Sequence, residues 1–156
     1  MNLLGKDLNE YVGVIKIPII INIAISLIGV GVTLASGLIS LAGPVGVLVS
    51  CFTGLGFLGI SVIVGISTAV YAGYIMAKKK SGTLVQTLAA GAILGLIVGV
   101  VGSITNMINT VINIIFLGNA GANLVIGLLI VVVGPIIAII IGGICSAIGG
   151  VIGGAK

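Results

Sequence analysis

Residues 78–82 read Lys-Lys-Lys-Ser-Gly, and these three lysines are the only charged side chains between Ile17 and Ala155. The stretches on either side, residues 17–77 and 83–155, are apolar and carry no charge. A membrane-spanning helix needs about 20 apolar residues, so each stretch is long enough for two spans. The lysine turn therefore predicts two apolar helical hairpins that are joined on one side of a membrane.

The composition of the whole chain favours a membrane environment. Of its 156 residues, 60% are hydrophobic and 5% are charged, whereas soluble domains carry about 25% charged residues. The mean hydropathy of +1.53 agrees with this comparison. The apolar runs are continuous and do not alternate with polar residues, which argues against a transmembrane β-barrel. We expect an all-α, polytopic bundle of transmembrane helices.

Turn-forming residues divide each apolar stretch into two spans. Gly43-Pro44 divides the first stretch and residues 117–123 (LGNAGAN) divide the second, because glycine, proline and asparagine favour turn conformations. The expected spans, which make up a transmembrane domain over residues 17–156, are about 17–41, 46–77, 83–105 and 124–150. Pro135 falls inside span four, where a neighbouring helix can satisfy the carbonyl that proline leaves unpaired.

Residues 1–16 hold both acidic side chains, Asp7 and Glu10, and we expect them to form a short N-terminal amphipathic segment. The apolar run from Ile17 to Ala35 also admits a signal peptide, although it is long for one and its cleavage site is poor.

All six basic residues are lysines, and four spans place them on the same side of the membrane. Lys6 and Lys16 precede span one, the lysine turn joins spans two and three, and Lys156 follows span four. Cytoplasmic loops carry an excess of basic residues, so we expect both termini to be cytoplasmic, in a cellular or a viral membrane. The candidate contacts for anionic lipid or an acidic partner are Lys78, Lys79 and Lys80.

Small residues recur at helical spacing within every span, and in span three they form the row Gly91, Gly95, Gly99 and Gly102. Helices in lipid associate through close backbone packing and hydrogen bonds, since hiding apolar surface gains nothing there. The candidate helix-packing residues are Asn22, Ser26, Gly29, Thr33, Gly65, Gly91, Gly95, Gly99 and Gly142. Spacing alone leaves open whether the partner helix belongs to the same chain or to another copy.

Residues 103–117 combine an apolar face with an uncharged polar face. The polar side chains, which fall within about 120° of a helical wheel, are Ser103, Asn106, Asn109, Thr110 and Asn113. The pattern fits an amphipathic helix lying at the outer membrane surface. It also fits a continuation of span three whose asparagines line a polar cleft, or a hydrogen-bond ladder between helices.

The sequence offers little catalytic chemistry. It contains no histidine and no arginine, and both acidic side chains precede the spans. Ion-coupled transporters place an ionisable group within the membrane, and metal sites need ligands that this chain lacks. Cys51 and Cys145 are expected towards opposite ends of the bundle, too far apart for a disulfide. We therefore expect no enzyme, no metal and no cofactor.

Residues 72–75 (AGYI) and 89–99 (AAGAILGLIVG), joined by the lysine turn, resemble the central hairpin of small glycine-rich four-span membrane proteins of archaea. In this chain the turn carries three lysines, where a mixed-charge glycine turn would be expected. The resemblance implies a four-helix membrane protein and implies no activity.

Three functions remain compatible with the sequence. The leading one is a non-enzymatic membrane protein that acts by helix packing, as a homo-oligomer, as a structural or accessory subunit of a membrane complex, or as a membrane or coat protein of a lipid-containing virus. The alternative is an oligomeric pore, channel or holin-like protein lined by Asn22, Ser26, Thr33, Asn106, Asn109 and Asn113. The third is a transporter for a small apolar or lipid-like solute. Expected partners are membrane lipids and membrane helices, and the lack of a basic stripe argues against nucleic acid.

Overall fold

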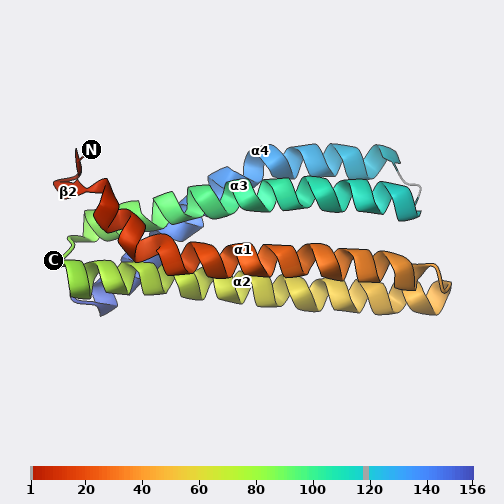
Figure 1. Cartoon of the computed structure of the whole chain (residues 1–156), viewed down its shortest axis with the longest axis horizontal. Helices are drawn as coiled ribbons and strands as arrows, with labels where there is room; N and C mark the ends of the chain where they lie inside the picture. The colour runs from red at the N-terminus through yellow and green to blue at the C-terminus, as the bar shows by residue number, and fades with distance from the viewer. Residues whose placement is uncertain (1, 118–119) are drawn as a thin grey trace.

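The computed structural model describes residues 2–117 and 120–156 and places most of them in four long helices (Figure 1). A short antiparallel pair of strands, β1 (Asn2–Leu3) and β2 (Lys6–Asp7), precedes the first helix. The helices are α1 (Leu8–Ser40), α2 (Pro44–Lys80), α3 (Leu84–Leu117) and α4 (Ala120–Ile152). The predicted all-α bundle of two helical hairpins is confirmed.

Each of the four helices is long and apolar enough to cross a membrane. At 1.5 Å per residue the helices are about 50–56 Å long, whereas the hydrocarbon core of a bilayer is about 30 Å thick. A helix of this length that crosses a bilayer therefore also reaches the head-group region.

The predicted N-terminal amphipathic segment over residues 1–16 is wrong in its extent. Residues 8–16 form the first turns of α1, because Tyr11, Val14, Ile15 and Pro18 follow the spacing of one helix face and are all buried against the bundle. Only the strand pair and its turn lie outside the helix. The helix that contains span one therefore begins at residue 8, before the predicted start of the span at residue 17.

Of the three arrangements that the sequence allowed for residues 103–117, a separate amphipathic helix at the membrane surface is wrong. α3 continues without a break to Leu117, because no glycine or proline interrupts it after Gly102. Its polar side chains contact α4, so the continuation packs within the bundle and does not lie flat on a membrane surface. Ser103 Oγ donates to Val131 O at 3.1 Å, and Asn106 Nδ2 donates to Gly127 O at 3.5 Å.

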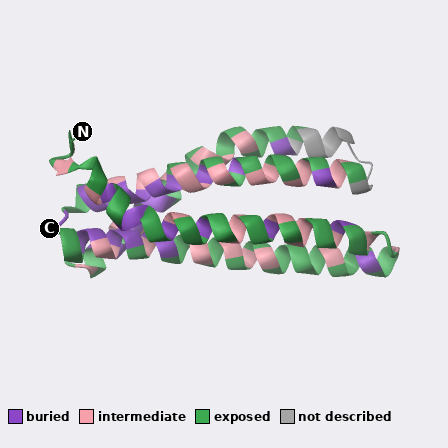
Figure 2. Cartoon of the chain, in the orientation of Figure 1, coloured by how far each residue is buried: buried purple, intermediate pink, exposed green. Residues whose placement is uncertain are grey.

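The hairpins α1–α2 and α3–α4 lie close together at one end of the bundle and apart at the other (Figure 1). The close end, which we call the lysine end, holds both termini and the lysine turn, and the open end holds the α1–α2 turn. α4 runs beside α3 and crosses to α2 at the lysine end. Buried residues gather at the lysine end (Figure 2), where Tyr11, Ile15, Met76 and Ala90 belong to the core.

Pro135 lies inside α4 and explains one contact between helices. Proline has no N–H, so it leaves the carbonyl four residues earlier, that of Val131, without its helical hydrogen bond. Ser103 Oγ of α3 donates to this carbonyl. The prediction that a neighbouring helix satisfies the carbonyl freed by Pro135 is confirmed.

Candidate functional site

Three of the four glycines in the predicted row of α3 pack closely against the backbone of α4. A Cβ atom added at Gly91 would overlap the carbonyl of Gly142, and one added at Gly95 would overlap the carbonyl of Ala138. A Cβ at Gly99 would lie 2.6 Å from Cα of Pro135. Such approaches need glycine. The partner of this row is therefore α4 of the same chain.

α4 makes a second close contact, with α2, that the sequence analysis did not select. A Cβ atom at Gly73 would overlap the carbonyl of Ser146. Ser146 Oγ donates to Thr87 O at 2.7 Å, so this residue of α4 contacts both α2 and α3. The signal available in the sequence was the row Ala69, Gly73 and Ala77, in which small residues recur every four positions.

The predicted packing residues of α1 and α2 are less tightly covered. Asn22 Nδ2 donates to Thr68 Oγ1 at 2.9 Å and links the two helices. A Cβ atom at Gly29 would lie 2.7 Å from the ring of Phe57, which is a side chain and not a backbone. An added Cβ at Gly65 would meet no atom of the described residues within 4 Å, because Gly65 lines the space between the hairpins.

Between the hairpins lies a cleft of about 630 Å³, which runs from the middle of the bundle towards the open end and is lined by all four helices. Its polar lining residues are Asn22, Ser26, Thr33, Ser61, Ser103, Thr105, Asn106 and Asn109. Five of the six residues that the sequence suggested for a polar lining thus meet in one place. The sixth, Asn113, is half-buried on α3 but does not line this cleft.

Several hydroxyl groups of the cleft donate their protons to the main chain, which leaves their oxygens to act as hydrogen-bond acceptors. These hydroxyls are Thr33 Oγ1, which donates to Gly29 O at 3.0 Å, Ser61 Oγ, which donates to Phe57 O at 2.9 Å, and Ser103 Oγ, which donates to Val131 O at 3.1 Å. The cleft is therefore richer in acceptors than in donors.

One asparagine oxygen of the cleft accepts no hydrogen bond from the residues that the structure describes. Asn109 Oδ1 is buried without a partner. The neighbouring Asn22 is 7% exposed, and its amide nitrogen donates to Pro18 O at 2.8 Å and to Thr68 Oγ1. An unsatisfied buried polar atom costs about 1–3 kcal/mol, so the oxygen of Asn109 requires an explanation.

Towards the lysine end the cleft leads into an apolar cavity of about 370 Å³. Asn22 and Gly65 line both spaces, and Leu94 is among the apolar residues of the inner one. Beyond the cavity, Tyr11 and Met76 are completely buried and fill the bundle. The cleft therefore ends inside this chain and does not pass through it.

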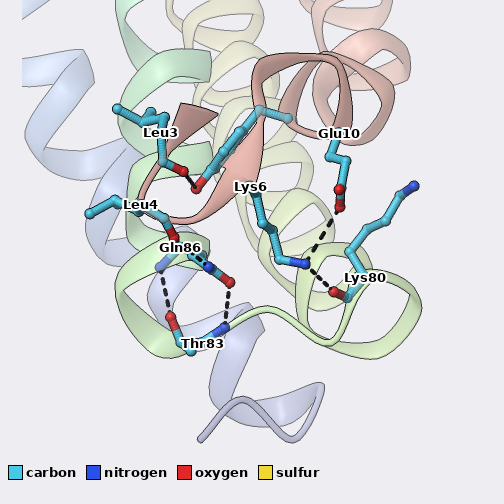
Figure 3. Close-up of polar contacts among 8 residues, drawn as sticks. Leu3, Leu4, Lys6, Glu10, Lys80, Thr83 and Gln86 are labelled. Atoms are coloured by element: carbon cyan, nitrogen blue, oxygen red, sulfur yellow. Dashed lines mark hydrogen bonds and ion pairs between the residues drawn. The ribbon is translucent and has the colours of Figure 1, made fainter. Parts of the chain in front are cut away.

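At the lysine end, the N-terminal strand pair is bonded to the lysine turn and to the start of α3 (Figure 3). Lys6 Nζ donates to Lys80 O and forms an ion pair with Glu10 at 3.5 Å. Gln86 Nε2 donates to Leu4 O at 2.7 Å. Tyr11 on α1 adds a further bond, from its hydroxyl to Leu3 O at 3.1 Å.

Gln86 also caps α3. Its Oε1 accepts a hydrogen bond from the backbone N–H of Thr83 at 2.9 Å, and Thr83 Oγ1 accepts one from the N–H of Gln86 at 3.4 Å. This reciprocal pair is a capping box. This capping box was not predicted, although Thr-x-x-Gln before an apolar run is its recognised signature.

The three lysines of the lysine turn and Ser81 are exposed on the surface of the lysine end, whereas Gly82 is buried. Lys78 Nζ contacts the hydroxyl of Tyr74 and lies 5.1 Å from the centre of its ring. Contact of Lys78, Lys79 and Lys80 with anionic lipid or an acidic partner stays a prediction. Cys51 on α2 is exposed and Cys145 on α4 is half-buried, and both are free thiols.

No family model, no curated protein and no solved structure matches the chain. Within residues 2–117 and 120–156, no three side chains of the types that bind metals come together.

Proposed function

We propose that this chain is a non-enzymatic integral membrane protein that acts through helix packing, as a homo-oligomer or as a subunit of a larger membrane complex. The observation that carries the proposal is the contrast between two sets of glycines. Gly91, Gly95, Gly99 and Gly142 of α3 and α4 are in contact with backbone of the same chain, whereas a Cβ atom would meet nothing within 4 Å, among the described residues, at Gly31, Gly56 or Gly59 of α1 and α2. In lipid, uncovered glycines allow another helix to approach closely.

The lysine end is the cytoplasmic face in this proposal. Both termini and the lysine turn lie at that end (Figure 1), as the positive-inside rule requires of a four-span protein with cytoplasmic termini. Lys79 and Lys80 are exposed there and are placed to contact anionic lipid head groups. The four-helix arrangement also suits the class of archaeal membrane proteins that the central hairpin resembles.

The mass of the purified protein in mild detergent tests the proposal. We expect a discrete oligomer or a co-purifying subunit, and we expect Gly56→Leu to reduce it to the single chain by blocking close approach. Gly13→Leu is the matched control, since Gly13 is also an exposed glycine with nothing within 4 Å but lies at the lysine end. A wild-type protein that is monomeric and alone, or equal effects of both substitutions, would contradict the proposal.

A pore is the second candidate, and the gathering of five predicted polar residues in one cleft favours it. Because the cleft ends inside a single chain, a continuous path would have to be completed between copies. A pore predicts dye leak from vesicles that contain the protein, and Asn109→Leu should change the leak rate. Vesicles that retain their dye would exclude this candidate.

A further inference from the structure

We propose that the cleft between the hairpins binds an uncharged amphiphile that carries a hydroxyl head group, of the kind represented by a long-chain alcohol. The hydroxyl lies at Asn109, and the hydrocarbon chain extends past Asn22 into the apolar cavity beside Leu94. The inference does not depend on the proposed assembly, because the residues that form the cleft all belong to one chain.

The chemistry of the lining selects the head group. Asn109 Oδ1 is buried and has no partner among the described residues. A hydroxyl donates to such an oxygen and also accepts from an amide N–H, so it suits a carboxamide in either orientation. No acidic side chain lines the cleft, so an ammonium head group would lose its hydration without gaining a counter-charge.

The depth of these residues agrees with an amphiphile oriented as in a lipid leaflet. At 1.5 Å per residue, Thr68, the partner of Asn22, is about 15 Å along α2 from Lys78, and Asn109 is about 38 Å along α3 from Leu84. With the lysine turn at one surface of a core about 30 Å thick, Asn22 lies near the bilayer centre. Asn109 lies at the depth of the opposite head groups, where a hydroxyl head belongs.

The size of the cleft favours a small amphiphile over a transmembrane helix as its occupant. A volume of about 630 Å³ falls within the range of about 300–1,000 Å³ that is usual for small-molecule pockets. A transmembrane helix 10–12 Å wide and 30 Å long needs on the order of 3,000 Å³, which exceeds even the whole empty space of about 1460 Å³ in and around the cleft. Ordinary acyl chains also fit, but they would leave the oxygen of Asn109 without a donor. Selection for the hydroxyl follows from that difference.

Photolabelling of the whole protein in phosphatidylcholine vesicles tests the inference. The probe is a long-chain alcohol with a diazirine in its chain, and its control is the methyl ether with the same chain and diazirine, which cannot donate. We expect the alcohol to label the protein at least about fivefold more than the ether, the ratio that one hydrogen bond supplies. The labelled residues should lie among those that line the cleft and the inner cavity, and excess non-photoreactive alcohol should prevent labelling.

Two variants test whether the side chain of Asn109 is the group that selects the hydroxyl. Asn109→Leu should bring labelling by the alcohol down to that by the ether, whereas Asn113→Leu should keep the preference, because Asn113 is on the same helix but does not line the cleft. Equal labelling of the wild-type protein by alcohol and ether would overturn the inference without requiring any variant to fold. Labels outside the cleft, or the same result for both variants, would also overturn it. The oligomer measurement remains a separate test of the proposed function.

Discussion

Gly95 and Gly102 belong to the same small-residue row of α3, and spacing treats them as equals. The structure separates them, because the backbone of α4 lies against Gly95 and nothing lies within 4 Å of a Cβ at Gly102. The row that was predicted from sequence is thus a real contact as far as Gly99 and ends there. The sequence could not show that Gly102 lies outside this contact. Helical spacing within α3 does not indicate where α4 diverges from it.

Alanine substitution at these two glycines should therefore have different effects. We expect Gly95→Ala to lower the free energy of unfolding by about 1–3 kcal/mol, because α3 and α4 must move apart. Gly102→Ala should be neutral or stabilising by up to about 1 kcal/mol, since alanine favours helix over glycine. Unfolding in detergent, followed by circular dichroism, measures both. Equal losses would contradict the close contact between α3 and α4.

At the scale of the helix, α3 shows why one prediction failed. The polar face of residues 103–117 is the same whether the segment lies on a membrane surface or continues the span, so the pattern could not decide between them. The deciding interactions come from α4, which is distant in sequence. Chief among them is the bond from Ser103 Oγ to the carbonyl that Pro135 frees.

A double-mutant cycle tests this interaction between α3 and α4. Ser103→Ala should cost about 1 kcal/mol, because it leaves Val131 O unpaired. In a Pro135→Ala background the same change should cost close to nothing, since the new N–H at position 135 bonds to Val131 O within the helix. Chemical unfolding gives the four stabilities, with Ser67→Ala, an exposed serine of α2 without a hydrogen bond among the described residues, as the control. Additive effects would show that Ser103 does not compensate for Pro135.

For the whole molecule, the lysine pattern was sufficient to predict two hairpins with the termini and the lysine turn at the same end. The separation of the two hairpins at the open end could not be predicted. Every span carries small residues, and their spacing does not show which helices remain in contact along their whole length. The polar lining was suggested from residue type alone, on Asn22, Ser26, Thr33, Asn106, Asn109 and Asn113. Only the packing of four helices shows that Asn113 is not part of the cleft.

The native cysteines provide a test of this topology. Cys51 is exposed and lies about 40 Å along α2 from Lys78, which is beyond a core about 30 Å thick. A maleimide that cannot cross membranes should label Cys51 from the side opposite to the termini and should not label Cys145. An impermeant amine reagent should reach the lysine turn only from the side of the termini. Labelling of both sites from one side would contradict the four-span arrangement.

The bonds of the N-terminal strand pair have a consequence for biosynthesis. Leu4 O accepts its hydrogen bond from Gln86, which lies 82 positions later in the chain. At ribosomal rates of about 5–20 residues per second, Gln86 emerges about 4–16 s after Leu4. During that interval the first seven residues have no partner in α3. The beginning of the polypeptide can therefore be held in place by this bond only after synthesis has passed the lysine turn and begun the second hairpin.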